Sequence, residues 1–249
     1  MTTVILLPGL ASDVTLWRDQ LPMLQARGPV HVTEAHAHFG TLPEMAIGLL
    51  AAHDGPLVLI GTSMGGILAL EVFRQAPQRV RAMALLGSSA RPDTPELIAL
   101  RTNAIGLFET GRMDEVLRAN VPFAFHASKA QDPELVADYL AMVRRAGPEQ
   151  LIRQNRAIMA RADSRPLLAG LSCPLLVVCG EADLLTPPEY SREIAAAVPQ
   201  ADLVLLPDCG HLLTLEQPQR INALLGDWLD RVDAQVNAEA GTRAAANTR

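Results

Sequence analysis

The sequence predicts an α/β fold, a mostly parallel six-stranded sheet with helices on both faces and an inserted helical cap. The first observation is that short apolar runs alternate with longer stretches of helical periodicity, the pattern of a parallel sheet covered on both sides. The second is that this alternation stops between residues 91 and 165, where only helical patterns occur. With 249 residues, 49% of them hydrophobic, the chain can bury a core of this size.

Each predicted element follows from a local pattern. The apolar runs predict strands at Thr3–Leu7, Val30–Glu34, Leu57–Ile60, Ala82–Gly87, Leu175–Cys179 and Leu203–Leu206. Amphipathic spacing predicts helices at Trp17–Arg27, Leu42–His53, Gly65–Gln75, Pro188–Val198 and Pro218–Asp233. Prolines in "APQRV" and "AVPQADLVLL" end the helices that precede two of the strands.

The interval 91–165 contains helical patterns that begin at Pro-Glu or stop at glycine. They are "PELIALRTNAIGLFETG", "RMDEVLRAN", "PELVADYLAMVRRAG" and "PEQLIRQNRAIMARAD". We predict that residues 91–165 form a helical cap, or lid, inserted into a core made of residues 1–90 and 166–234. The last dozen residues, "AEAGTRAAANTR", lack an apolar face, and we expect residues 235–249 to form a disordered tail.

Composition excludes several classes of protein. A net charge of −6 argues against a general nucleic-acid or anionic-membrane binder, and no apolar run reaches the roughly 18 residues that span a bilayer. The N-terminus lacks the basic region of a signal peptide, and three scattered cysteines do not suit a disulfide scaffold or a zinc site. We therefore expect a soluble, cytoplasmic protein, monomeric or homodimeric, with no metal, no cofactor, and neither a nucleic-acid nor a membrane partner.

A candidate nucleophile lies in "PLVLIGTSMGGILALEVF", residues 56–73. Gly61-Thr62-Ser63-Met64-Gly65 matches G-x-S-x-G between a predicted strand and a predicted helix. Such a turn would hold Ser63 in a strained conformation with its hydroxyl exposed above the sheet. A side chain at Gly61 or Gly65 would collide with the neighbouring helix or strand. The alternative reading is an ordinary tight turn, but the strand and helix on either side favour a nucleophile.

A serine needs a base to take its proton, and the chain has six histidines. His211 follows the last predicted strand directly, so its loop would lie at the carboxyl edge of the sheet, where ligands bind in open α/β sheets. We therefore predict that His211 is the general base. The other histidines are His31, His36, His38 and His53, which precede the serine, and His126 in the predicted cap.

The imidazole in turn needs a carboxylate that fixes its tautomer and stabilises the imidazolium. Asp183 follows the strand Leu175–Cys179 and Gly180, and it is the preferred candidate. Asp93, after the fourth strand, stays open as an alternative. Glu181 is nearer to the glycine, and we expect it to point away.

An oxyanion hole would complete the site. The Met64 amide, directly after the candidate nucleophile, can supply one donor at the positive end of the following helix. The loop after the first strand can supply the second, because Pro8-Gly9 allows a sharp turn that leaves the Leu10 amide free. Taken alone, that loop would read as an ordinary strand-to-helix turn.

Together these motifs resemble the α/β-hydrolase superfamily, in particular its compact bacterial branch of lidded carboxylesterases and lactonases. The resemblance runs from Thr3 to about Asp233 and keeps the order Ser63, Asp183, His211 typical of that fold. It implies a Ser63/Asp183/His211 triad, an oxyanion hole from Leu10 and Met64, and a helical cap. The matching segments are Pro8-Gly9, Gly61–Gly66, Gly180–Asp183 with Thr186-Pro187, and Gly210-His211 with Glu216 and Pro218.

The chain departs from the family pattern in three places. Pro8-Gly9 replaces the usual His-Gly, so a histidine that stabilises the oxyanion loop is missing there. The chain begins on what would be the third strand of the family, so we expect six strands and an edge that is exposed or covered by a partner. The turn after the second strand is replaced by "EAHAHFGTLPE", in which His36 and His38 could line the rim of the pocket.

The predicted function is that of a serine hydrolase cleaving a small carboxylic ester or lactone through an acyl-enzyme on Ser63. The alternatives are a methyl esterase acting on a carrier-linked acyl chain, a C–C bond hydrolase or lyase using the same triad, and a non-catalytic ligand-binding member of the fold. An aromatic content of 4% argues against a lipase with a broad lipid-binding face. Five cap arginines could clamp a substrate carboxylate, although solvated helix faces are the preferred reading: Arg118, Arg144, Arg145, Arg153 and Arg156.

Overall fold

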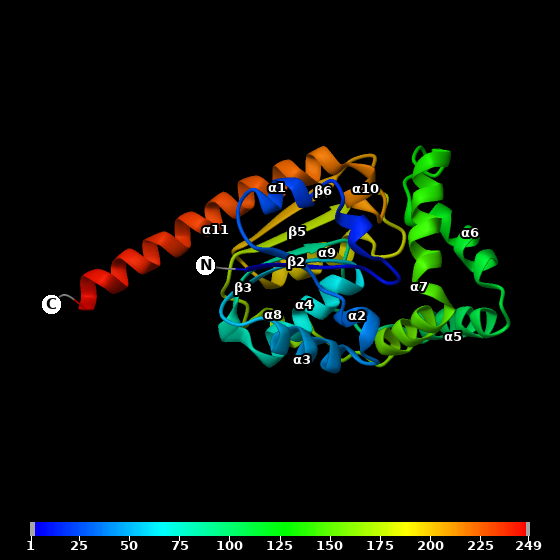
Figure 1. Ribbon diagram of the computed structural model, residues 1–249, viewed down its shortest axis with the longest axis horizontal. Helices are drawn as coiled ribbons and strands as arrows, with labels where there is room; N and C mark the ends of the chain where they lie inside the picture. The colour runs from blue at the N-terminus through cyan, green and yellow to red at the C-terminus, as the bar shows by residue number, and fades with distance from the viewer. Residues whose placement is uncertain (1–2, 248–249) are drawn as a thin grey trace.

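The computed structural model describes residues 3–247 and contains one six-stranded sheet in the order β2-β1-β3-β4-β5-β6 (Figure 1). All neighbouring strands pair in parallel, as predicted. The strands are β1 Thr3–Leu7, β2 Val30–Val32, β3 Leu57–Thr62, β4 Val80–Leu86, β5 Leu175–Gly180 and β6 Ala201–Leu206. All six predicted strands are present, with ends that differ by a few residues.

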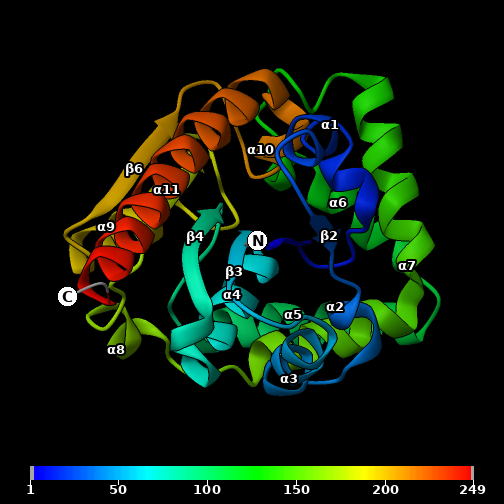
Figure 2. The same ribbon diagram turned by 60° about the vertical axis from the view of Figure 1, so that its left-hand side comes forward.

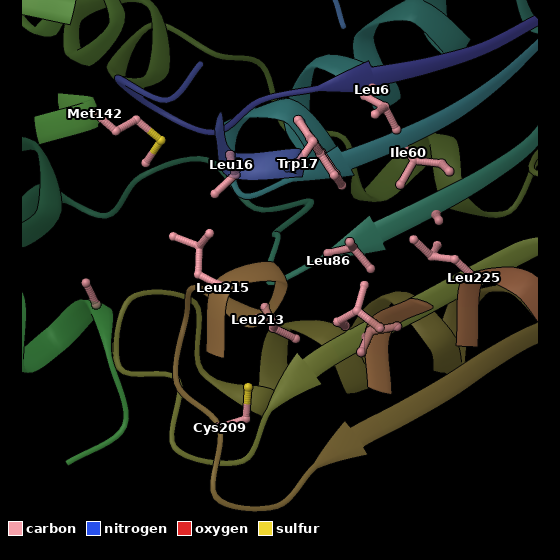
Figure 3. Close-up of a cluster of buried hydrophobic side chains, with 14 of the residues drawn as sticks. Leu6, Leu16, Trp17, Ile60, Leu86, Met142, Cys209, Leu213, Leu215 and Leu225 are labelled. Atoms are coloured by element: carbon pink, nitrogen blue, oxygen red, sulfur yellow. The ribbon is translucent and has the colours of Figure 1, made fainter. Parts of the chain in front are cut away.

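Helices cover both faces of the sheet. Alternate residues of each strand point to opposite faces, so each face contributes its own side chains to a core. Leu6, Ile60 and Leu86 pack with Trp17 and Leu225 on the face covered by η1, α1 and α11 (Figure 3). Figures 1 and 2 show α3 and α4 on the opposite face, and α9 contributes to the same core there. The bounds are η1 Val14–Trp17, α1 Leu21–Gln25, α2 Ala35–His38, α3 Leu42–Ala52, α4 Met64–Gln75, η2 Pro77–Arg79, α9 Pro188–Ala197, α10 Leu213–Glu216 and α11 Pro218–Asn247.

The connection from β4 to β5 is the helical insertion that the sequence predicted. It contains α5 Pro95–Glu109, α6 Met113–Ala124, α7 Pro133–Met159 and the short α8 Arg165–Leu168. Inside α7 the backbone breaks at Gly147 (φ 75°, ψ 169°), next to Pro148, where the sequence patterns placed a boundary between two helices. The division into a core of 1–90 and 166–234 and a cap of 91–165 stays a prediction.

Two elements differ from expectation. The helix expected at Trp17–Arg27 is replaced by η1 and the short α1, in which Pro22 occupies the first turn. The last helix was expected to end at Asp233, but α11 continues to Asn247 and projects from the body in Figure 1. It thus enters the segment 235–249 expected to be disordered, because the alanines there favour helix. Residues 248–249 lie outside the described residues.

Among the helices within residues 3–247, none, including α11, combines the length and the apolar character needed to cross a bilayer.

Candidate active site

Ser63 occupies the turn between β3 and α4 with φ 50° and ψ −116°. A positive φ at a non-glycine residue is strained, and it persists only where the surroundings hold it. The Ser63 N–H donates to the Leu86 carbonyl at 2.9 Å, and the Ser88 hydroxyl donates to the Ser63 carbonyl at 2.8 Å. Ser63 is therefore held on both sides, by the last residue of β4 and by the segment that follows it, in the geometry that the G-x-S-x-G motif predicts.

The glycines of this turn are required by close backbone contacts. A Cβ at Gly61 would overlap the backbone of Gly65 and Gly66 in α4. A Cβ at Gly65 would overlap the Leu7 carbonyl at the end of β1. The predicted collisions with a neighbouring helix and a neighbouring strand are thus confirmed.

The structure brings His211 and Asp183 together in a buried pair. Their Nδ1 and Oδ2 atoms are 2.8 Å apart. The Asp183 carboxylate also accepts the backbone N–H groups of Leu185 and Thr186, both at 2.9 Å, and the Thr186 hydroxyl at 2.8 Å. These contacts satisfy the carboxylate and aim one oxygen at Nδ1 of the imidazole, so the hydrogen bond to Asp183 occupies Nδ1 and not Nε2.

Burial and pairing act in opposite directions on the two pKa values. Burial would raise the pKa of Asp183, but the neighbouring His211 and the hydrogen bonds from His211 and Thr186 hold it below its ordinary value. Burial would lower the pKa of His211, but attraction to Asp183 and their hydrogen bond raise it above its ordinary value. The pair is therefore suited to a histidine that gains a proton during a reaction.

Gly87 lies close to the Asp183–His211 pair, and the residue before it is hydrogen-bonded to Ser63. It follows β4 directly, and a Cβ there would lie 3.2 Å from Asp183 Oδ2 and 3.3 Å from His211 Nδ1. The residue before it, Leu86, accepts the N–H of Ser63. All three candidate catalytic residues are thus gathered around the end of β4, at the carboxyl edge of the sheet.

Asp93, the alternative acid, lies elsewhere. Its buried carboxylate is 2.8 Å from Arg101 and 2.8 Å from Arg161, two arginines of the helical insertion. The structure thus brings Asp183, and not Asp93, to the histidine.

Glu216 holds the His211 loop, a role that sequence reasoning missed. Its buried carboxylate accepts backbone N–H groups from Gly210 and Leu212, each at 3.0 Å, and from His126 at 2.9 Å. Burial raises the pKa of Glu216 although these hydrogen bonds work to lower it. The sequence signal was the position of Glu216 five residues after His211, which we named only among the segments that match the family.

The candidate oxyanion loop, residues 8–12, follows β1. Met64 is buried at the first position of α4, and Leu10 is half-buried in the loop. The Ala11 N–H donates to Gln154 Oε1 at 2.7 Å, and His36 Nε2 lies 2.8 Å from the Ser12 carbonyl. The loop is therefore tied to α7 and α2, and sequence reasoning identified neither contact.

The expectation that His36 and His38 line a pocket rim is not met by His36. Its side chain is only 3% exposed, because it is turned inward onto the loop after β1. His38 lies at the surface, with Nε2 3.6 Å from the carboxylate of Glu34.

The cap arginines are mostly engaged on the surface. Arg144 pairs with Asp114 at 2.9 Å, and Arg156 pairs with Glu109 at 3.0 Å. The remaining three differ in partner: Arg145 pairs with Asp13 at 2.8 Å, Arg153 donates to the Ala37 carbonyl, and Arg118 is exposed. These contacts favour solvated helix faces over a clamp for a substrate carboxylate.

Within the part of the chain that the structure describes, no group of three or more His, Cys, Asp or Glu side chains is arranged to hold a metal ion. Cys173, Cys179 and Cys209 are free thiols. Burial raises the pKa of Cys173 to about 11, so this thiol is protonated at neutral pH.

Comparison with known proteins agrees with the fold. Pimeloyl-[acyl-carrier protein] methyl ester esterase from Neisseria meningitidis is 26% identical over 241 residues, covering 91% of this chain and 92% of that protein. A thermophilic esterase from Thermogutta terrifontis superposes with a TM-score of 0.84 at 29% identity, covering 93% of this chain and 90% of the other. The enol-lactonase from Burkholderia xenovorans LB400 has a TM-score of 0.83 at 26% identity, covering 92% and 91%. The model of the alpha/beta hydrolase family matches residues 4–224, and the chain therefore belongs to the α/β-hydrolase family.

Proposed function

We propose that this α/β-hydrolase is a serine hydrolase that cleaves a small carboxylic ester or lactone through an acyl-enzyme on Ser63. The observation that carries the proposal is the strained Ser63 at the carboxyl edge of the sheet, beside the buried Asp183–His211 pair. Ester hydrolysis is also the class of reaction that the family and its similar esterases support.

In the proposed first step, His211 Nε2 takes the proton of the Ser63 hydroxyl while Oγ attacks the substrate carbonyl carbon. The carbonyl oxygen becomes negative and accepts hydrogen bonds from the Met64 and Leu10 amides. His211 then gives its proton to the leaving oxygen as the carbon–oxygen bond breaks. Asp183 stays ionised throughout and stabilises the imidazolium, consistent with the lowered pKa of Asp183 and the raised pKa of His211.

In the second step, water attacks the acyl-enzyme with His211 again acting as the base. The acid product leaves when Ser63 regains its proton. A lactone would follow the same steps, with its leaving oxygen still attached to the acyl group.

A second candidate substrate class is a methyl ester at the end of a carrier-linked acyl chain. It is favoured by one observation, the similarity over 91% of this chain to an esterase whose name specifies such a substrate. The same residues would carry out the same two steps, with methanol as the leaving group. The two classes differ in the leaving group and in whether the acyl chain is attached to a carrier protein.

Turnover of a substrate series tests the proposal. We expect hydrolysis of aryl acetate and butyrate esters or of small lactones, reduced by about 10³-fold or more in Ser63→Ala. A free methyl ester assayed beside the same ester on an acyl carrier protein separates the two classes. A wild-type protein that turns over none of these substrates contradicts the proposal, as does a Ser63→Ala variant with full activity.

A further inference from the structure

Gln154 joins the helical insertion to the candidate oxyanion loop. It lies on α7 with no exposed surface, and both ends of its amide are bonded. Oε1 accepts the Ala11 N–H at 2.7 Å, and Nε2 donates to the His36 carbonyl at 2.8 Å. A buried amide is tolerated only when its donor and acceptor are satisfied, so these two bonds fix the side chain and the two segments that it touches.

The hydrogen bond from the candidate oxyanion loop to Gln154 is made by a residue with a strained backbone. Ala11 has φ 53°, a conformation that a residue with a Cβ rarely adopts and that depends on its surroundings. The bond from Gln154 fixes the Leu10–Ala11 peptide, and the next peptide toward the N-terminus carries the Leu10 N–H. The orientation of a candidate oxyanion donor therefore depends on a side chain that lies 143 positions away in the sequence.

His36 supplies a second support for the same loop. Burial lowers the pKa of His36, so the ring is neutral at neutral pH, and its Nε2–H donates to the Ser12 carbonyl at 2.8 Å. Because Gln154 also binds the His36 backbone, the loop, α2 and α7 form one closed set of hydrogen bonds. These contacts hold a loop that has Pro8 where the sequence resemblance led us to expect a stabilising histidine.

We propose that Gln154 is a positioning residue that holds the oxyanion loop in its working conformation, so that transition-state stabilisation depends on the seating of the helical insertion. This inference rests on the proposed function. Its chemical consequence is specific: losing the bond to Ala11 would misdirect the Leu10 N–H, which acts on the tetrahedral intermediate more than on the bound ester. The loss should therefore appear in kcat and leave KM nearly unchanged.

The test is steady-state hydrolysis of an aryl acetate by Gln154→Met, which keeps the length of the side chain but removes both hydrogen bonds. We expect kcat to fall about 10- to 100-fold with KM within about twofold of the wild-type value. Buried at this position, Gln154→Glu keeps both bonds as the neutral acid, with one oxygen accepting the Ala11 N–H and its O–H donating to the His36 carbonyl, and in that form it should recover a large part of the lost kcat. His36→Leu removes the bond to Ser12 and should also lower kcat, which gives a second test if Gln154→Met does not fold.

The matched control is Asn155→Leu. Asn155 is the next residue on α7 and is also buried and bonded at both ends, but its partners, Leu151 and Arg101, both belong to the helical insertion. We expect Asn155→Leu to lower the melting temperature as much as Gln154→Met does while keeping the wild-type kcat. Wild-type kcat in folded Gln154→Met or His36→Leu, or an equal loss in Asn155→Leu, overturns the inference and leaves the proposed function intact. A wild-type protein that hydrolyses no ester or lactone overturns both.

Discussion

Ser63 keeps a backbone conformation that costs about 1–3 kcal/mol at a residue with a side chain. Leu86 and Ser88 hold it there through hydrogen bonds to its backbone N–H and carbonyl. Because Leu86 ends β4 and Ser88 lies in the segment directly after it, the serine is fixed without help from a substrate. In the proposed mechanism, its reactivity depends on the nearby Asp183–His211 pair.

Exchange of Asp183 tests the assignment of the acid. Asp183→Asn keeps the shape of the side chain but removes the charge that stabilises the imidazolium, so we expect ester kcat to fall by about 10³- to 10⁴-fold. Thermal unfolding should show that the variant remains folded. A variant with kcat within tenfold of the wild-type value would exclude Asp183 from this role.

Asp93→Asn is the matched comparison. Its effect should be on stability, since Arg161 would keep a buried charge without its carboxylate, at a loss of about 3–5 kcal/mol in the free energy of unfolding. Ester kcat of the folded variant should stay within about twofold of the wild-type value. The opposite result, a stable but inactive variant, would return Asp93 to the active site.

The pH dependence of kcat/KM reports the protonation of His211. The base must be neutral, so activity should be lost as the pH falls through the pKa of His211 in the free enzyme. Asp183 raises that pKa, so the midpoint should lie above the ordinary histidine value of about 6.5, and it should move to lower pH in Asp183→Asn. A wild-type midpoint below 6.5, or one that Asp183→Asn leaves in place, would contradict the pairing.

Residues in local motifs were predictable from the sequence, and residues defined by distant contacts were not. Ser63, Gly61 and Gly65 follow from the spacing of one turn. Gln154 and His36 meet across 118 positions, and one glutamine on a cap helix carries no local signal for such a contact. Because His211 and Asp183 each follow a predicted strand, the sequence predicted that both lie at the carboxyl edge of the sheet. Asp93 also follows a strand, so the sequence did not exclude it as the acid that pairs with His211.

At the scale of elements, the close approach of α4 to β1 depends on Gly65. In Gly65→Ala the new Cβ would overlap the Leu7 carbonyl, a backbone atom that cannot move without displacing β1. We expect a loss of about 1–3 kcal/mol or more in the free energy of unfolding, measured in urea, together with loss of ester hydrolysis.

Gly106→Ala is the control for this change. Gly106 lies in α5, where an added Cβ would meet nothing within 4 Å, so alanine should stabilise the protein by about 0.5–1 kcal/mol. If both variants change stability equally, the close contact at Gly65 does not limit the packing of α4.

The elements that sequence analysis placed best are those with a strong periodic pattern and a clear stop. Proline and glycine near their ends define α3, α5 and α9, and the break at Gly147 divides α7 as predicted. The short α2 and α10 were missed, because four residues are too few to show a helical period. The extension of α11 was missed because its last turns have no apolar face to mark them as helix.

At the scale of the whole molecule, the parallel topology gathers the site. Ser63 follows β3, Asp183 follows β5 and His211 follows β6, so parallel pairing brings all three to one edge of the sheet. The helical insertion leaves from the end of β4 between them. Gln154 bonds the insertion to the candidate oxyanion loop, and Glu216, which holds the His211 loop, accepts a hydrogen bond from His126 of the insertion. Alternation of strands and helices predicted this topology, but the bonds between the insertion and the loops depend on tertiary packing.

The most direct test of an activated serine in this architecture is intact mass after brief exposure to a fluorophosphonate. Wild-type protein, Ser63→Ala and His211→Ala should be treated side by side. We predict that only the wild-type protein gains one adduct, because Ser63 is the acceptor and His211 makes it reactive. An adduct on Ser63→Ala, or a wild-type protein that stays unlabelled, would contradict the assignment of Ser63 as the nucleophile activated by His211.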